Sequence, residues 1–358
     1  QAQAQFGRLV QGGIKIMNNK MSDLLYCEFY KINRKHTLLK LAIAVVVIAL
    51  AITALSAVLH SVFPSVVISE GLSDYDAQIA SLKAEMEVIY ADSSWIDKLI
   101  VTNSMAGYKA RIAILEYLKA HNVTSGSTMA YTSNSALGFF GFDVYSFTNL
   151  CMSVLMSVVI IFLIVACCRT TCGEYASGAM KMQFLRPLNK NKFFTAKWLS
   201  VVIVAEALTL ISFFLSFILG LILYGPNALN VAFVAGSLVT IVPPMGALMI
   251  ILLINMVQVF ALTQATMFIC SLCNTYGKSI VLCLLFLFFS FGTWVEYVLA
   301  VPYVGYLGFL ANLDWSSGIS VDGTIFKGMS IWGMIPITLL WCALFMWFSY
   351  KRFNKKEV

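Results

Sequence analysis

Long apolar stretches alternate with short polar or basic stretches from about residue 41 to the C-terminus. A helix needs about 20 predominantly apolar residues to cross the hydrocarbon core of a bilayer, and these stretches have that length and almost no charge. The pattern therefore predicts an all-α, polytopic membrane protein with six transmembrane helices. The predicted spans are Leu41–Val62, Phe147–Cys168, Trp198–Tyr224, Met245–Cys270, Ser279–Leu299 and Ile331–Tyr350.

The segments between the spans divide the chain into regions. Residues 1–20 have no apolar period and begin without Met, which is typical of a leader or a cloning scar, and we expect them to be disordered. Residues 21–37 place Leu24, Phe29 and Ile32 at helical spacing, which predicts a cytoplasmic amphipathic helix on the inner leaflet or, alternatively, a plain juxtamembrane extension. The other regions are the first span at 38–62, an outer domain at 63–146, spans two to five at 147–299, an outer segment at 300–330, and the sixth span with a basic tail at 331–358.

The outer domain carries two apolar stripes. One begins at Ile79 and the other at Tyr108, and both repeat at a spacing of three and four residues. This spacing predicts two amphipathic helices that pack as an extracellular hairpin. The Ser-, Gly- and Asn-rich stretch at 122–138 is predicted to form a flexible return to the membrane.

A further apolar stretch at 230–242 is too short to cross the bilayer alone. Pro243-Pro244 would separate it from the fourth span, because proline cannot continue a helix through its own position. We expect the stretch to lie half-inserted or at the membrane interface. The alternative is a fourth helix that is long and kinked.

Composition and charge support a membrane protein and orient it. The chain is 60% hydrophobic and 11% charged, with a mean hydropathy of +0.84, whereas soluble domains carry roughly 25% charged residues. The termini and the loops predicted on the same side hold 18 of the 24 Lys and Arg residues. Basic residues favour the cytoplasmic side, so both termini are predicted to be inside. The net charge of +7 is then a signature of topology and does not indicate nucleic-acid binding.

The nine cysteines do not form a recognisable metal motif. None lies in 63–146 or 300–330, the outer segments where disulfides would be useful. Cys167, Cys168, Cys172 and the pair Cys270 and Cys273 lie near predicted cytoplasmic helix ends, but no histidine accompanies them. Because cysteine serves freely as a small apolar residue, we expect no metal site.

No catalytic chemistry is recognisable either. The three histidines form no H-E-x-x-H pair, and the sequence holds no G-x-S-x-G nucleophile motif. Gly277-Lys278-Ser279 resembles the end of a phosphate-binding loop, but Leu272 stands where the upstream glycine is required. The chain is therefore not expected to be an enzyme, and no catalytic residue or cofactor is expected on it.

The cytoplasmic loop at 169–197 has the most specific pattern. Thr171 and Glu174 have the spacing of a capping box, which predicts a short surface helix at 172–184. Tyr175 and Met182 lie on one face of that helix, and a proline stops it. On these grounds alone the helix could equally be an anchored connector.

The same loop contains, in order, Gly173-Glu174, Ser177-Gly178, Arg186-Pro187, Lys190 and Lys197. This string resembles the signature loop of ABC-2 permeases, the membrane subunits of one class of ATP-binding-cassette transporters. In that family an acidic residue opens the loop, a small residue and a glycine follow, and a Pro-x-x-basic turn leads to a lysine before the third span. The six-span layout and the N-terminal amphipathic helix are also similar, while the long outer domain departs from the simplest members.

The resemblance implies a mechanism and partners. Two permease chains would pair in a bacterial cytoplasmic membrane, and each would bind a cytoplasmic nucleotide-binding subunit that holds ATP and Mg²⁺. The helix at 172–184 would be the coupling helix that docks on this ATPase. The long outer domain favours members that export peptides, lantibiotics or other antimicrobials. The residues implied in coupling are Gly173, Glu174, Tyr175, Gly178, Met182, Arg186, Pro187 and Lys190.

One ionisable residue lies inside a predicted span. Glu206 is about two turns into the third span, where a charge is costly and faces protein or water. It could line the substrate path together with Asn255 and Gln258, which share a face of the fourth span. The alternative is an interfacial glutamate that bonds to a neighbouring helix.

Two other classes of function compete with the exporter. A channel or a membrane-embedded sensor would use the outer domain without any ATPase partner, so co-purification of an ATPase would exclude it. A membrane enzyme is disfavoured, because the sequence presents no acid–base or nucleophile cluster.

Overall fold

The structure is a computed structural model, and it contains both long apolar helices and a small sheet. The residues it describes are 21–33, 37–62, 75–91, 108–109, 111–121, 128–130, 143–176, 190–226, 230–235, 238–291, 309, 313, 315, 319 and 331–355. The predictions for residues 1–20 and for most of 300–330 fall outside these residues.

Five helices are long and apolar enough to cross a membrane. They are α3 (Thr37–Val62), α6 (Val144–Cys168), α9 (Lys190–Tyr224), α10 (Pro244–Leu272) and α13 (Ile331–Lys355). A sixth apolar helix, α11 (Tyr276–Phe291), is shorter. The prediction of a mainly helical chain with several helices long and apolar enough to span a membrane is thus confirmed. The fifth predicted span, Ser279–Leu299, corresponds to α11 and is described only as far as residue 291.

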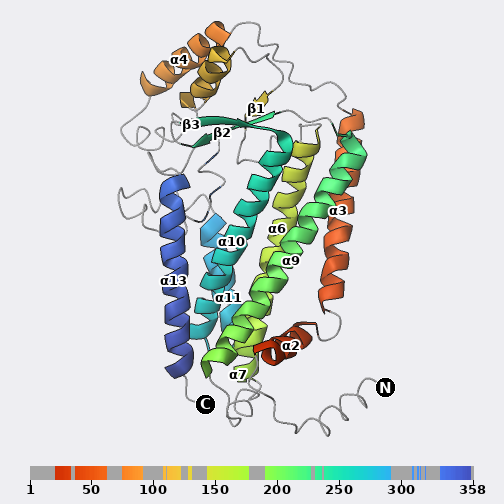
Figure 1. Cartoon of the computed structure of the whole chain (residues 1–358), viewed down its shortest axis with the longest axis vertical. Coiled ribbons are helices and arrows are strands. Elements are labelled where there is room, and N and C mark those ends of the chain that lie inside the picture. Colours follow the sequence, from red (N-terminus) through yellow and green to blue (C-terminus); the bar gives the residue numbers. More distant parts are fainter. Residues whose placement is uncertain are drawn as a thin grey trace.

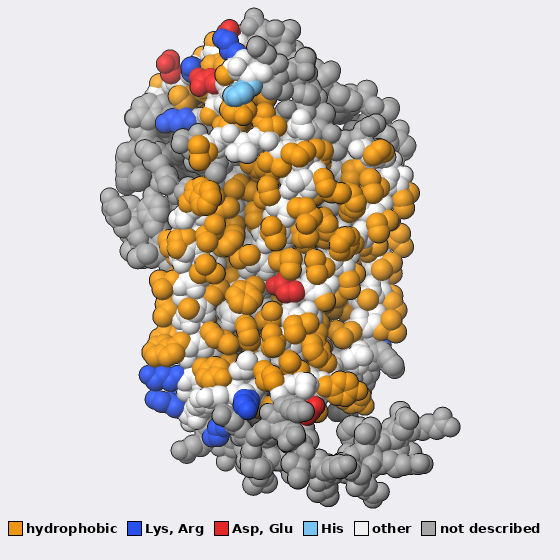
Figure 2. Space-filling view, viewed as in Figure 1, with side chains coloured by type: hydrophobic (Ala, Val, Ile, Leu, Met, Phe, Trp, Pro, Cys, Tyr) orange, Lys and Arg blue, Asp and Glu red, His pale blue; other side chains and the backbone are white. Residues whose placement is uncertain are grey.

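The long helices run side by side, with α6 among α3, α9, α10 and α11 (Figure 1). The amphipathic helix α2 (Met21–Ile32) crosses beneath them at one end, where α9 begins and α13 ends (Figure 1). We call this end the basic end, because the Lys and Arg side chains of α9 and α13 collect there (Figure 2). Between the two ends the surface is a broad apolar band (Figure 2).

Local signals explain where the helices begin and end. The side chain of Asp143 accepts a hydrogen bond from the Ser146 N–H at 2.8 Å and caps the start of α6. Pro244 is the first residue of α10, where its missing N–H costs nothing. The predicted break at Pro243-Pro244 is therefore confirmed. Gly225 follows α9 with φ of 72°, the left-handed conformation that commonly ends a helix.

The end opposite α2 carries a three-stranded sheet that the sequence analysis did not predict. β1 (Thr128–Ala130) pairs in parallel with β2 (Asn230–Ala235), and β2 pairs antiparallel with β3 (Leu238–Val242). The stretch at 230–242 is therefore a pair of strands, so the alternative of a lengthened fourth helix is wrong, while the expected place at the membrane interface stays a prediction. The fold is also not purely α-helical. Val231 of β2 is buried in the core of the helix bundle, whereas Ala232 on the other face of the strand is buried against Ile114 and Leu118 of the segment at 63–146, so β2 connects the two.

The same end holds the helices of the segment at 63–146. α4 (Tyr75–Ala91) lies beside a helical segment at 111–120. Lys119 Nζ lies 2.5 Å from Asp76 Oδ1, and Lys83 Nζ lies 3.7 Å from Glu116 Oε1. These exposed ion pairs each add little stability, but both join the same two helices.

Candidate functional site

The loop after α6 begins differently from the capping-box prediction. α6 continues through a π-helical turn at Arg169–Gly173 into the short helix α7 (Glu174–Ala176). The hydroxyl of Thr171 lies 3.6 Å from the sulfur of Met267, and the Glu174 carboxylate binds two lysines. The predicted capping box at Thr171 and Glu174 is therefore wrong. π-helical turns are rare and occur frequently at functional sites.

Four charged side chains meet at the basic end, and we call them the ion network: Glu28, Lys31, Glu174 and Lys197. They come from α2, α7 and α9, which are far apart in the sequence. Lys31 Nζ lies 2.6 Å from Glu28 Oε1 and 2.8 Å from Glu174 Oε1. Lys197 Nζ lies 2.5 Å from Glu174 Oε2 and 3.5 Å from Glu28 Oε2. Two carboxylates and two ammonium groups give a neutral arrangement.

Lys197 is the centre of the ion network. Its side chain is 0% exposed, and the Glu28 side chain is 2% exposed. Besides the two carboxylates, its ammonium group donates to the backbone oxygen of Thr170 at 2.8 Å. The three donors of a lysine ammonium group are thereby all used. A buried charge is tolerated only with such partners, so each bond to Lys197 is needed to hold it there.

Aromatic side chains complete the surroundings of the ion network. The ammonium groups of Lys31 and Lys197 lie 5.8 and 4.7 Å from the ring centroid of Phe193, within the range of cation–π attraction. Phe353 of α13 packs against Phe193, and its ring centroid lies 6.3 Å from that of Tyr175. The C-terminal turn of α13 thus joins α7 and α9.

α2 is fastened to the bundle by one stripe of its surface. Leu24, Glu28 and Ile32 recur every four residues, and all three are buried. The sequence analysis placed Leu24 and Ile32 on the apolar face, but it did not include Glu28. Desolvation lowers the pKa of Lys31, yet Glu28 and Glu174 outweigh it and raise that pKa above its ordinary value. Lys31 is therefore charged throughout the neutral pH range.

The described coupling residues fall in two places. Gly173 and Glu174 lie at the end of the π-helical turn, and Lys190 is the exposed first residue of α9. Tyr175 is half-buried against Phe353, which differs from its expected place on an exposed helix face. The predicted residues outside the described part of the chain are Gly178, Met182, Arg186 and Pro187.

Glu206 lies in the apolar part of α9 and is half-exposed. Its Oε2 is a buried atom with no hydrogen-bond partner among the described residues. Asn255 of α10 bonds to the Ile251 oxygen of its own helix at 2.8 Å. The structure describes no hydrogen bond that joins Glu206 with Asn255 or Gln258. Among the residues that the structure describes, no bond from Glu206 to a neighbouring helix supports the alternative interpretation.

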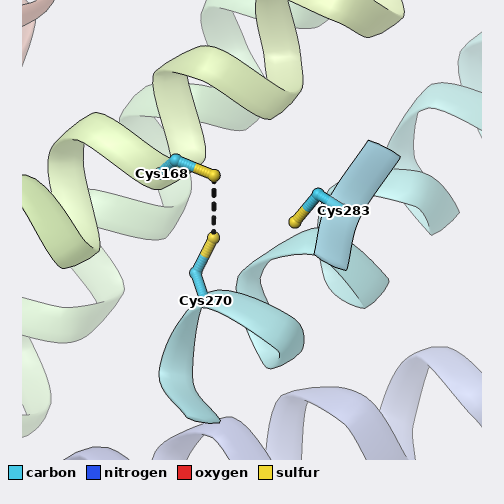
Figure 3. Close-up of side chains that lie close together, drawn as sticks. All are labelled: Cys168, Cys270 and Cys283. Carbon is cyan, nitrogen blue, oxygen red and sulfur yellow. Dashed lines mark hydrogen bonds between the residues drawn. The ribbon is translucent and has the colours of Figure 1, made fainter. Parts of the chain in front are cut away.

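A second group of reactive side chains lies beside the ion network. The sulfur atoms of Cys168, Cys270 and Cys283 all lie within 4.8 Å of one another, and we call them the cysteine cluster (Figure 3). The Sγ atoms of Cys168 and Cys270 are 3.6 Å apart. Soft metal ions prefer such thiol groups, so this cluster is the described part of the chain best suited to hold a metal.

Sequence reasoning missed Glu28, Lys197 and Cys283 as site residues. Lys197 was quoted only as part of the family string, and Glu28 was absent from the argument. One signal was present for Lys197, because a lysine between Ala196 and Trp198 at the start of a span needs a buried partner. Nothing in the sequence predicted that Cys283 lies close to Cys168.

The comparisons with known proteins place this site within one family. The search of curated proteins found no match to the chain. A family model described as "Protein of unknown function (DUF2705)" matches residues 112–358, more than half of the chain. The match includes Glu174, Lys197 and the cysteine cluster, and it leaves out α2. The chain belongs to the DUF2705 family.

Proposed function

We propose that this chain is the membrane permease subunit of an ATP-driven exporter, and that a separate cytoplasmic ATPase docks on the basic end. The cargo would be a peptide, a lantibiotic or another amphipathic antimicrobial. The chain would act with a second permease chain in a bacterial cytoplasmic membrane and would hold no nucleotide itself. The family resemblance of the loop at 169–197 is one support for this proposal, and the ion network is the other.

The observation that carries the proposal is the bond between Glu174 and Lys197. Glu174 lies at the start of the loop in which the ATPase would dock, and Lys197 lies inside the first turns of the long helix α9. A push on the loop would therefore be transmitted to α9 through a buried contact. Lys31 adds α2 to the same unit through Glu174. Transporters need such a rigid connection, because alternating access moves whole helices against one another.

Residues next to the bond between Glu174 and Lys197 are exposed on the surface. Ala176, two residues after Glu174, is exposed, and the segment at 177–189 that follows contains the remaining coupling residues. Lys190 and Lys192 at the start of α9 are also exposed. The exposed residues would meet the ATPase, while Glu174 and Lys197 transmit its movement.

The proposal is tested by reconstituting two components. The chain is co-expressed with a nucleotide-binding subunit encoded beside its gene, purified, and placed in liposomes. We expect the ATPase to co-purify with the chain, and we expect hydrolysis only when the ATPase is present. ATP hydrolysis by the chain alone, or a lack of any association with the ATPase, would contradict the proposal.

A pair of variants tests whether the ion network transmits movement. Glu174→Gln keeps the shape of the side chain and removes its charge, so it should lower export per ATP hydrolysed while the ATPase still binds. Glu116→Gln changes an exposed glutamate at the opposite end and serves as the control. Equal coupling ratios in both variants would count against the role of Glu174.

A further inference from the structure

The cysteine cluster is formed by three different helices. Cys168 is the last residue of α6, Cys270 lies in the last turn of α10, and Cys283 lies in α11. The side chains of Cys168 and Cys270 point toward one another, and Cys283 points into the same space (Figure 3). All three cysteines are buried. A cysteine that only fills space among apolar side chains has no need to meet two others in this way.

The distances fit one small, soft metal ion. Zinc binds thiolate sulfur at about 2.3 Å, so two sulfurs of a tetrahedral site lie about 3.8 Å apart. Cys168 and Cys270 have 3.6 Å between their sulfurs, and no pair in the cluster exceeds 4.8 Å. The cluster would therefore have to contract by about 1 Å at most to reach the bonding geometry.

The fourth ligand would be an oxygen atom that already lies beside the sulfur atoms. The hydroxyl oxygen of Ser279 lies 3.1 Å from the sulfur of Cys168 and 3.1 Å from that of Cys270. Three sulfurs and one oxygen would give four ligands, the number that zinc has in tetrahedral structural sites. Cys172 supports the cluster from outside, because its thiol donates to the backbone oxygen of Cys270 at 3.1 Å.

The cluster lies next to an exposed stretch of the chain. Cys270 and Ser279 flank the turn between α10 and α11, and residues 274–278, which form this turn and the start of α11, are exposed. A cation is also favoured near the end of α10, because the carbonyl groups at a helix C-terminus carry partial negative charge.

From this geometry we propose that Cys168, Cys270 and Cys283 bind one metal ion of the zinc class, with Ser279 as the fourth ligand. On binding, each thiol gives its proton to solvent, and the three thiolate sulfurs and the serine oxygen coordinate the ion. No electron transfer is involved. The bound ion would fasten the C-terminal ends of α6 and α10 to the middle of α11. Cys168 is two residues along the chain from Thr170, whose backbone oxygen binds Lys197. This proposal does not depend on the export function.

The test is a titration of the reduced, chelator-treated full chain in detergent with Co²⁺, which reports thiolate ligands through charge-transfer absorption. We expect one Co²⁺ per chain, absorption from three thiolates, release of about three protons per ion, and displacement by Zn²⁺. This part needs no variant. A chain that gives no thiolate-to-cobalt absorption would overturn the proposal.

Single substitutions then locate the ion. Cys168→Ser, Cys270→Ser and Cys283→Ser should each weaken binding by at least about 100-fold, since even indirect supporting residues typically account for 10–100-fold. Ser279→Ala should weaken binding less. The control is Cys151→Ser, which changes a buried cysteine of α6 outside the cluster. Unchanged affinity in the three cluster variants, or an equal loss in Cys151→Ser, would overturn the proposal.

Discussion

Lys197 Nζ lies 2.5 Å from Glu174 Oε2, although the two residues belong to different helices and the lysine side chain is 0% exposed. A lysine is rarely buried completely without a partner. Here the partner is the residue that opens the loop at the basic end. The contact joins α7 to α9, and Lys31 joins α2 to α7 through the same carboxylate.

Removing the buried cation should destabilise the protein strongly. In Lys197→Met, Glu28 and Glu174 lose the more deeply buried of the two lysines that bind them both, and breaking a buried ion pair in this way costs about 3–5 kcal/mol. The measurement is the free energy of unfolding in mixed detergent micelles. Lys192→Met, five residues earlier on the exposed surface of α9, is the control and should change it by less than about 0.5 kcal/mol. Equal stability of the two variants would show that the buried bonds contribute nothing.

The attachment of α2 should depend on Lys31. Lys31→Met removes two ion pairs, so the amide protons of α2 should exchange faster with solvent, whereas Lys40→Met on exposed α3 surface should leave them unchanged. The raised pKa of Lys31 means that the charge contributes below its ordinary pKa and is lost as pH rises through the higher folded-state pKa. The protection of the α2 amide protons against exchange should therefore be constant from neutral pH to about pH 10. Loosening of α2 near pH 8 would contradict the assignment.

The contact between α6 and α9 should not tolerate a larger residue at Gly220. A Cβ atom there would lie 3.1 Å from Phe147 Cδ1 and 3.2 Å from Thr148 Oγ1. Gly220→Ala should therefore destabilise the fold by about 1–3 kcal/mol through overpacking. Gly333→Ala in α13 meets no atom within 4 Å and should stabilise its helix by about 0.5–1 kcal/mol. Thermal unfolding in detergent distinguishes them, and a stabilising Gly220→Ala would refute the close contact.

Glu206 should matter for transport and not for folding. Its Oε2 has no partner among the described residues, so Glu206→Gln should leave the unfolding temperature unchanged or raise it. If the carboxylate lines the substrate path, Glu206→Gln and Glu206→Ala should both lower export by about tenfold, the effect of one lost interaction of about 1.4 kcal/mol. Normal export in both variants would remove Glu206 from the path.

The long helices could be predicted because their signal is local. A run of some 20 apolar residues suffices to indicate a membrane span, and α3, α6, α9, α10 and α13 follow the predicted spans closely. The first turns of α9 were missed. Lys190, Lys192 and Lys197 gave this region the composition of a loop, but packing of Phe193 and Phe194 in the core extends the helix through it.

The sheet had a signal that the sequence reading did not use. The β-branched and aromatic runs at 230–235 and 238–242 are separated by Gly236-Ser237, a two-residue pattern that favours a hairpin. β1 had no such signal, because three residues are too few to show alternation. Single members of the ion network and the cysteine cluster had sequence signals, but which residues meet in each group could not be predicted. Their members are separated by up to 169 residues, and only the packing of the helices brings them together.

The central claim is that the segment beginning at α7 docks a separate ATPase, and site-specific photo-cross-linking tests it most directly. A cross-linking amino acid replaces Ala176, which is exposed beside Glu174, and Ser81, which is exposed on α4 at the opposite end, serves as the control position. Each variant is co-expressed with the ATPase, irradiated in membranes and analysed by mass spectrometry. The account predicts a cross-link to the ATPase from position 176 and none from position 81. Co-purification of the ATPase without any cross-link from 176, or with a cross-link from 81, would contradict it.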